Sequence, residues 1–330
     1  MEVGRSLVEK IKEIKNCLIY YGNLLKTKSI RKYIIRYDEH TYSDYFCIPR
    51  QYCGRKTATA DGANEVIYQK ILEGKPLMVA RYGSTELYNM EIFDLNYKSR
   101  YDIAMQTLTV NAGFFPNDIE MARKFTKILK SASHNIDVLA FWNIFREEYY
   151  IKHLMSSCVD LIPLRYLEPW FSKKPWTKAL EGKKVLVIHP YAETIEQQYK
   201  KRCLLFSDPN ILPKFQLYTV KAVQSMGGKC EFFDTWFNAL DWMIDEALKI
   251  DFDIALIGCG AYGMPLAAQL KEYGKQAIHM GGVLQILFGI KGKRWDSDPI
   301  VSKLYNDAWV RPSDKDRPKV ANQVEGGCYW

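Results

Sequence analysis

The sequence predicts an α/β fold of the Rossmann-like, doubly wound type, with a mostly parallel sheet and a helical arm at the N-terminus. Short apolar runs recur along the chain, and a turn rich in glycine and polar residues follows each of them. Short apolar runs without alternation are typical of strands that are buried on both faces, as in parallel sheets. The runs are 76–80, 135–141, 183–188, 252–257 and 275–278.

Helical patterns separate several of these runs and complete the prediction. Helices are expected over 119–129, 236–250 and 264–273. The segment GKCEFF, at 228–233, is expected to be the strand before the second helix, which gives a right-handed βαβαβ unit with the two strands that follow. Either Asp234 or Thr235 can cap the second helix, and Gly274 can end the third.

The chain is expected to form one main domain with two extensions. Residues 62–296 form the Rossmann-like domain, and residues 1–61 form a basic helical or irregular arm. The tail, residues 297–330, ends in EGGCYW, and its aromatic residues favour packing of the tail back on the domain.

Composition places the chain among globular proteins of reducing compartments. Its 48% hydrophobic content is ordinary, and no apolar stretch reaches the ~18 residues of a membrane span. The N-terminus lacks a signal peptide's apolar core, which predicts a cytoplasmic location. The eight cysteines form no CxxC pair, and His40, Cys47 and Cys53 lack both the spacing and the fourth ligand of a zinc site.

The positive charge is concentrated in the arm. Residues 1–37 hold nine Lys or Arg and three Glu, a net charge of +6, whereas the whole chain carries +8. Leu7, Ile11 and Ile14 recur at helical spacing between lysines, a pattern that favours peripheral contact with anionic lipid at the inner face of a membrane. The alternative is a helix that packs on its own domain with a solvated lysine face. No nucleic-acid motif is present, and the oligomeric state is left open.

The turns after the apolar runs contain the candidate site residues. In an open parallel sheet, ligands bind beyond the carboxyl ends of the strands, so these turns are expected to meet at one edge. The candidates for binding a ligand there are Arg81, Tyr82, Gly83, Ser84, Asn143, His189, Tyr191, Glu193, Gly258, Gly260, Ala261, Tyr262, Gly263, His279, Gly281 and Gly282, and the catalytic candidates are Glu86, Arg81 and His189.

The glycines at 258, 260 and 263 fit a GxGxxG pattern between a strand and a helix. Such glycines allow a phosphate to approach the backbone, and the helix start offers free N–H groups. A turn needed only for helix–sheet packing is the alternative. The next strand ends in His279 rather than in the acid that grips a ribose in NAD enzymes, which counts against a dehydrogenase.

The remaining candidates are polar residues, and most of them have more than one possible role. His279 can bond a phosphate or a sugar hydroxyl, or cap the next helix, and His189 with Glu193 can form a general base or a polar turn. Arg81 suits a diphosphate or a carboxylate. Glu86 can be a base, a metal ligand or a favourable acid at a helix start, and Ser84 can be a simple cap.

Taken together, ARYGSTE (80–86) and DIALIGCGAYG…HMGG (253–282) resemble the GT-D type glycosyltransferases, Rossmann-like bacterial enzymes that assemble surface polysaccharides and glycoproteins from nucleotide sugars. Their first strand is followed by a turn like R-F-G-D-G-E, whose Asp-x-Glu pair is associated with a divalent metal and catalysis. Arg81, Gly83 and Glu86 match that turn, Tyr82 replaces the Phe, and Ser84 stands where the Asp is expected.

The resemblance implies transfer of a sugar from a nucleotide-sugar donor to a polysaccharide, lipid-linked or protein-linked glycan acceptor. Glu86 would be the one carboxylate left for Mn²⁺ or Mg²⁺, so metal dependence is open, and Arg81 with glycine N–H groups can instead neutralise the leaving diphosphate. The alternatives are another transferase on the same scaffold, pyruvyl or methyl, and a non-catalytic protein that binds sugar nucleotides or scaffolds an assembly. Asp234 lies too early relative to the glycine motif for a methyltransferase.

Overall fold

The structure, a computed structural model, describes residues 48–144, 146–225 and 230–316. It also describes Ile11, Ile14, Lys15, Leu18, Ile19, Tyr21 and Gly22 of the N-terminal arm, and Gly327 and Tyr329 near the C-terminus. The other arm residues, Leu7 included, and the rest of EGGCYW lie outside the described residues. In the described part of the chain, no helix is both long and apolar enough to span a bilayer.

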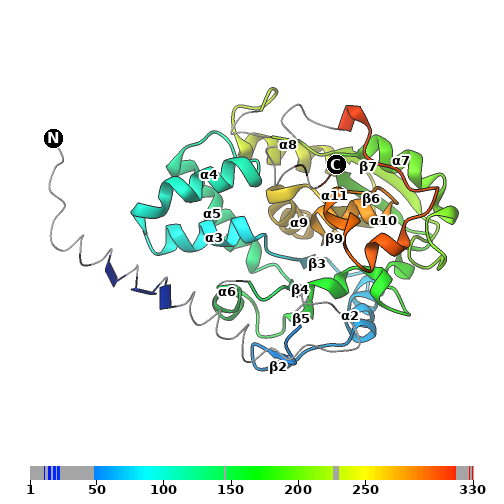
Figure 1. The fold of residues 1–330 in the computed structure, drawn as a ribbon, viewed down its shortest axis with the longest axis horizontal. Coiled ribbons are helices and arrows are strands. Elements are labelled where there is room, and N and C mark those ends of the chain that lie inside the picture. Colours follow the sequence, from blue (N-terminus) through cyan, green and yellow to red (C-terminus); the bar gives the residue numbers. More distant parts are fainter. Residues whose placement is uncertain are drawn as a thin grey trace.

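A parallel sheet with helices on both faces forms the centre of the molecule, as the sequence predicts (Figure 1). Its strands are β3 (Leu77–Ala80), β4 (Val138–Phe141), β5 (Asp160–Pro163), β6 (Lys184–His189), β7 (Gln216–Lys221), β8 (Ile254–Ile257) and β9 (Gln276–His279). Their order across the sheet is β5-β4-β3-β9-β8-β6-β7, and every neighbouring pair is parallel. A separate short hairpin consists of β1 (Gln51–Tyr52) and β2 (Arg55–Lys56).

Each inner strand is buried on both faces because its side chains alternate between two apolar cores. In β3, Met78 and Ala80 face one core, whereas Leu77 and Val79 face the other. All four are almost completely buried, which is why the sequence shows a continuous apolar run rather than an alternating one.

The helices form a layer on each face of the sheet. The longer ones are α2 (Ala60–Leu72), α3 (Ser84–Asp94), α4 (Tyr101–Asn111), α5 (Ile119–Ser133), α6 (Glu147–Leu154), α7 (Ala192–Tyr199), α8 (Trp236–Leu248) and α9 (Gly263–Glu272), followed by the short α10 (Leu284–Leu287) and α11 (Lys293–Asp296). Helices α3, α4, α5, α8 and α9 enclose one core, and α2, α7 and α10 enclose the other. In Figure 1, α3, α4 and α5 stand together on one side of the sheet, and α2 and α7 lie on the other.

The expected helices form where the sequence places them. Helix α8 begins after Thr235 rather than Asp234, because the Thr235 hydroxyl accepts a hydrogen bond from the backbone N–H of Asn238 at 3.2 Å. Helix α9 ends just before Gly274, whose φ of +81° lies in the left-handed region that glycine tolerates.

The predicted strand at GKCEFF is wrong in its described part, because Cys230–Phe233 has no strand structure. The strand before α8 is instead β7, and the chain also forms β5, which the apolar runs did not indicate. The βαβ connections therefore run β7-α8-β8 and β8-α9-β9.

The strand order sets the position of the ligand site. From β3 the chain moves outward to β4 and β5, whereas β6, β7 and β8 lie beyond β9 on the other side. The connections thus leave in opposite directions from the centre of the sheet, and a crevice forms at the carboxyl ends of the strands at such a switch point.

Candidate functional site

A cavity of about 710 Å³ lies at the carboxyl edge of the sheet, where the sequence predicts the site. Residues that follow every one of the parallel strands contribute to its wall, from Arg81 after β3 to Met280 after β9. The predicted residues that line it are Arg81, Gly83, Ser84, Glu86, Asn143, His189, Tyr191, Gly258, Gly260, Ala261, Tyr262, His279, Gly281 and Gly282.

Three predicted residues do not line this cavity. Tyr82 is fully buried in the core, where its hydroxyl donates to Ser133 Oγ at 2.7 Å. Glu193 pairs with Lys221 on the surface, with 3.3 Å between carboxylate and ammonium. Gly263 packs against the ring of His279, and that ring rather than the glycine lines the cavity.

Arg81 directly follows β3, which pairs with β9, the central strand of the sheet. Its guanidinium stacks over the indole of Trp142, with 4.7 Å from Cζ to the ring centroid, and its chain passes Gly281. No carboxylate of the described residues forms an ion pair with it. A half-buried arginine held over an aromatic ring, with its charge uncompensated, suits an anionic ligand.

The turn that holds Trp142 is organised by Glu147. This carboxylate is buried, accepts the Tyr52 hydroxyl at 2.9 Å and accepts the Trp142 N–H at 3.3 Å. Burial raises the pKa of Glu147 to about 7, while the hydrogen bonds oppose that rise. Asn143 follows with a positive φ of 53°, so the turn presents both Trp142 and Asn143 to the cavity.

Glu86 folds back over the start of α3. A Cβ on Gly83 would lie 1.7 Å from Glu86 Oε2, so only glycine leaves room for this carboxylate. An acid at the third helical position that reaches back to the helix start satisfies its N–H groups and its dipole. Glu86 also lines the cavity, and the exposed Ser84 lies beside it.

The donor set around Ser84 and Glu86 is a poor fit to a resident divalent metal. The described residues contain no group of three or more His, Cys, Asp or Glu side chains arranged to hold one. Mn²⁺ and Mg²⁺ favour several oxygen ligands with carboxylates among them. This turn offers one carboxylate, of Glu86, and the hydroxyls of Ser84 and Thr85.

His189 is buried, and its ring accepts a backbone hydrogen bond in the turn after β6. Its Nδ1 accepts the backbone N–H of Tyr191 at 3.0 Å, which leaves the proton of the neutral ring on Nε2. Burial lowers the pKa of His189 to about 3, so the ring does not charge near neutral pH. Its predicted partner, Glu193, pairs with Lys221 instead.

His279 is the second buried histidine of the cavity. Burial and the nearby Arg81 lower its pKa to about 3, although the Ile257 carbonyl opposes the shift. Its Nδ1 has no hydrogen-bond partner among the described residues. An added Cβ at Gly263 would lie 2.1 Å from this ring, so the glycine is needed for the ring to reach the cavity.

The glycines after β8 and β9 have two distinct functions. Gly260 has a φ of +59° and open space around it, and Gly281 has a φ of +70° near Arg81, so both need the left-handed region. Gly258 and Gly282 are needed for close packing. An added Cβ at Gly258 would lie 2.7 Å from the His189 ring, and one at Gly282 would lie 2.2 Å from the Tyr329 ring.

Tyr262 completes this part of the wall. Its ring stacks on Trp236, with 4.7 Å between centroids, and its hydroxyl lies 3.0 Å from Ser225 Oγ, which follows β7. These contacts join the loops after β7 and β8.

Several lining residues were not indicated by the sequence. Trp142 lies beside the predicted Asn143, and Arg165 and Glu168 follow β5, a strand that no apolar run indicates. Asp298 and Tyr329 come from the C-terminal part of the chain, and their approach to the cavity depends on tertiary packing. One sequence pattern does indicate Glu168. LRYLE follows the apolar pair Ile162-Pro163, in the same way that the other polar turns follow their apolar runs.

The fold and the cavity together define an α/β protein with a large cavity at the carboxyl edge of a doubly wound sheet. No protein-family model matches the chain, and no curated protein matches it. A solved structure described as "The highly conserved domain of unknown function 1792 has a distinct glycosyltransferase fold" is similar over 79% of this chain and 92% of that one, at 12% identity and a TM-score of 0.40.

A second solved structure, a selenomethionine-substituted form of the same domain, is similar over 76% of this chain and 96% of that one, at 10% identity and a TM-score of 0.35. At these identities and TM-scores the likeness assigns no activity, and what the cavity binds depends on its own residues.

Proposed function

We propose that the chain is a glycosyltransferase that moves a sugar from a nucleotide-sugar donor to a glycan acceptor. The observation that carries this proposal is the position of Arg81, over Trp142 and beside the glycine turns of β8 and β9, at the switch point of the sheet. An anion bound there would meet a fixed cation and the N–H groups of glycine turns.

The proposed transfer depends mainly on stabilising the charge of the leaving diphosphate. Arg81 and the 258–263 turn are the groups that would do so, and preorganised donors of this kind supply the largest share of catalysis in such reactions. His189 would donate through Nε2–H and position the ligand. Trp142 Nε1 and His279 Nδ1 are buried and have no hydrogen-bond partner among the described residues, and both residues line the cavity.

A non-catalytic protein that binds sugar nucleotides is the second candidate. It is favoured by one observation, the Glu86 carboxylate folded over Gly83 as a helix-capping acid does. Both candidates bind a donor, but only the glycosyltransferase releases the nucleoside diphosphate from it. Measuring that release with a bound donor therefore separates the two.

A thermal-shift panel tests the proposed function. UDP-, GDP-, ADP- and dTDP-sugars are added in turn, with Mn²⁺ or with EDTA, and the melting temperature is measured. We expect at least one donor to raise it by several degrees, and the rise to persist in EDTA because the turn at Ser84 is a poor metal site. The absence of any shift contradicts both candidates, and a shift that needs Mn²⁺ contradicts the metal-free arrangement.

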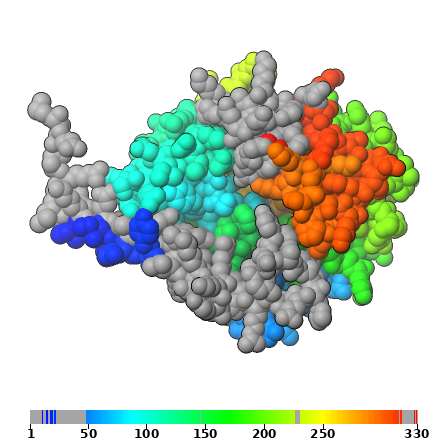
Figure 2. All heavy atoms as spheres, in the orientation of Figure 1, coloured from blue at the N-terminus to red at the C-terminus, as the bar shows by residue number. Residues whose placement is uncertain are grey.

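We also propose that the N-terminal arm makes peripheral contact with anionic membranes. Ile11, Ile14 and Leu18 are helical and 57%, 61% and 69% exposed, with Lys15 beside them. Figure 2 shows the described arm residues in blue at the edge of the molecule, next to the cyan helices, where Arg100 donates to the Tyr21 hydroxyl at 2.6 Å. An exposed apolar stripe with lysines is typical of helices that lie in the lipid interface.

Sedimentation with vesicles tests this contact. The chain is expected to sediment with phosphatidylserine-containing vesicles and not with pure phosphatidylcholine vesicles. Replacing both Ile11 and Ile14 with Asp should abolish the binding without changing the melting temperature, because both side chains are exposed. Equal binding of the double variant would show that the stripe is not the contact.

A further inference from the structure

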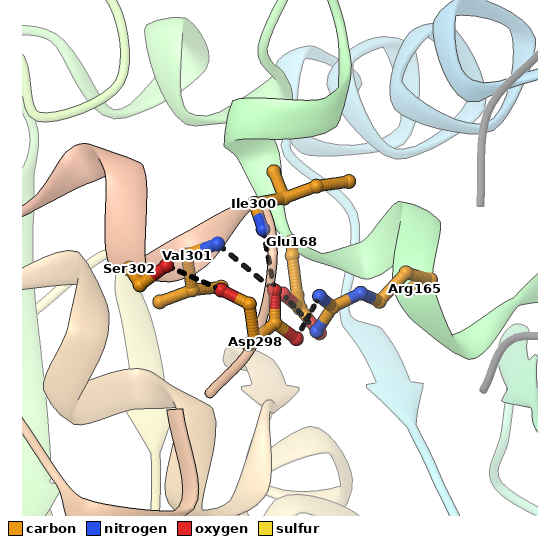
Figure 3. Close-up of polar contacts among 6 residues, drawn as sticks. All are labelled: Arg165, Glu168, Asp298, Ile300, Val301 and Ser302. Carbon is orange, nitrogen blue, oxygen red and sulfur yellow. Dashed lines mark hydrogen bonds and ion pairs between the residues drawn. The ribbon is translucent and has the colours of Figure 1, made fainter. Parts of the chain in front are cut away.

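Arg165, Glu168 and Asp298 form a cluster of charges in the wall of the cavity (Figure 3). Arg165 and Glu168 belong to the segment after β5, and Asp298 follows α11, so the cluster joins parts of the chain that are 133 residues apart. One guanidinium nitrogen of Arg165 lies 3.1 Å from both carboxylate oxygens of Glu168, and the other donates to Asp298 Oδ2. Two carboxylates therefore share one cation.

The carboxylates that line the cavity differ in how they are held. Glu86 lies over Gly83 at the start of α3. Asp298 is used structurally, because its Oδ1 accepts the backbone N–H groups of Ile300 and Val301 at 3.0 and 2.9 Å while its Oδ2 accepts from Arg165. Glu168 is held by the side chain of Arg165, and its carboxylate is not tied to the start of a helix.

Glu168 is buried from bulk solvent yet reaches the cavity. Its side chain is 8% exposed, that of Arg165 is 6% and that of Asp298 is 10%, and all three residues line the same cavity. Burial raises the pKa of Glu168 to about 7, and the negative charge of Asp298 adds to this rise. Arg165 and Trp170 act in the opposite direction and lower the pKa by less. A carboxylate in such a setting accepts a proton near neutral pH.

We propose that Glu168 is the general base of the transfer, the group that takes the proton from the acceptor hydroxyl. This inference rests on the proposed function. The acceptor oxygen forms a bond to the anomeric carbon while its proton passes to a Glu168 oxygen. The bond between the anomeric carbon and the diphosphate oxygen breaks, and its electron pair leaves with the diphosphate. Glu168 then returns the proton to solvent through the open cavity.

Arg165 and Asp298 act as positioning residues for this base. Arg165 also packs on the ring of Phe171, with 4.6 Å from Cζ to the centroid, so its planar group is fixed from three directions. Because Asp298 anchors the 298–302 segment to Arg165, the C-terminal part of the chain sets the direction in which Glu168 faces.

Glu168→Gln tests the inference, because glutamine keeps the shape and can still accept from Arg165. With the donor that gives the largest thermal shift, and with water or an added glycan as acceptor, nucleoside diphosphate release should fall by about 10²–10⁴-fold. The donor-induced shift should be unchanged. Glu181→Gln, on an exposed glutamate outside the cavity, is the matched control and should keep full turnover.

A pH profile and a conservative variant separate catalysis from structure. Wild-type kcat/KM should rise through about pH 7 as Glu168 loses its proton, with Arg165 and Asp298 as the charged groups that act on it. Glu168→Asp keeps a carboxylate and should retain more turnover than Glu168→Gln. Equal losses in both variants, together with equal losses of melting temperature, would assign Glu168 a structural role and overturn the inference.

The inference and the proposed function fail in different ways. If no nucleotide sugar shifts the melting temperature, or if a bound donor is never turned over, the proposed transfer is contradicted and the base falls with it. The other outcome is that the wild type transfers sugar and Glu168→Gln retains turnover within about threefold, a change of about 0.7 kcal/mol in the activation free energy. The proposed transfer then stands, and the assignment of Glu168 as the general base is wrong.

Discussion

At the scale of single residues, the site depends on a charge that the fold leaves uncompensated. Arg81 is oriented by the Trp142 ring, and the described residues place no carboxylate in an ion pair with it. Arginine in such a position presents a planar fork of donors that matches two phosphate oxygens, which lysine does not reproduce.

Replacement of Arg81 is therefore predicted to remove donor binding. Arg81→Ala should lower nucleotide-sugar affinity by about 10- to 100-fold, as loss of a charged hydrogen-bond donor does, and Arg81→Lys should recover part of it. Isothermal titration calorimetry measures both. Arg311→Ala, which removes an exposed ion pair with Asp296, is the control and should leave affinity unchanged. Unchanged affinity in Arg81→Ala would place the diphosphate elsewhere.

Local sequence could identify some of these residues and not others. Arg81 and the glycines were predictable because each directly follows a buried strand. Tyr82 was misjudged as a ligand contact, although Met78, Ala80 and Tyr82 alternate onto the same core, so strand parity already favours burial. Arg165 and Asp298 meet only through tertiary packing, and no local pattern signals a pair that lies 133 residues apart.

At the scale of elements, the turn between β8 and α9 is fitted to the end of β9. Gly263 opens α9, and the ring of His279 occupies the space that a side chain there would need. The glycine motif thus has a packing function at its last position and an open, left-handed turn at Gly260.

Gly263→Ala is predicted to destabilise the protein and to disturb the site together. The new methyl would lie 2.1 Å from the His279 ring, so either the helix or the ring must move. We expect a loss of about 1–3 kcal/mol in the free energy of unfolding, with weaker donor binding. Urea denaturation measures the loss in the free energy of unfolding. Gly62→Ala, in α2, meets only the Thr59 hydroxyl at 3.2 Å and should cost much less. Equal costs would contradict the packing argument.

The elements that the sequence analysis missed share a physical cause. β5 and β7 are the two edge strands of the sheet, and β7 in particular carries exposed and half-buried residues. An edge strand lacks the continuous burial that gives an inner strand its uninterrupted apolar run. GKCEFF and the β7 segment QLYTVK each hold three hydrophobic residues in six, so apolar content alone does not distinguish them.

At the scale of the whole molecule, several buried carboxyl groups make the free energy of unfolding depend on pH. Burial raises the pKa of Glu91 to about 8, although Arg146 lies 3.3 Å away, and raises the pKa values of Glu147 and Glu168 to about 7. In the folded state these groups hold protons that the unfolded chain has already released, so the free energy of unfolding falls as pH rises toward the folded pKa values.

The melting temperature is therefore predicted to fall between about pH 6.5 and about pH 8. The buried His189 and His279 do not offset this fall, because their lowered pKa values cost stability only below the unfolded value of about 6.5. Glu91→Gln should flatten the upper part of the curve. Calorimetric scans across this range measure the slope, and a melting temperature that rises with pH would contradict it.

The order of strands also bears on how the chain matures during synthesis. β9 lies between β3 and β8, so the last strand to emerge joins the two halves of the sheet. Until residues 276–279 are made, β3 and β8 each present an unpaired edge of fully buried residues, and such edges invite pairing with other chains. His279 and the turn with Gly281 arrive with that same strand. The same pairing therefore removes the exposed edges and brings His279 and Gly281 into the cavity wall, and Asp298 and Tyr329 follow later in the chain. A nascent chain holds no complete site while its strand edges are still exposed to misassembly.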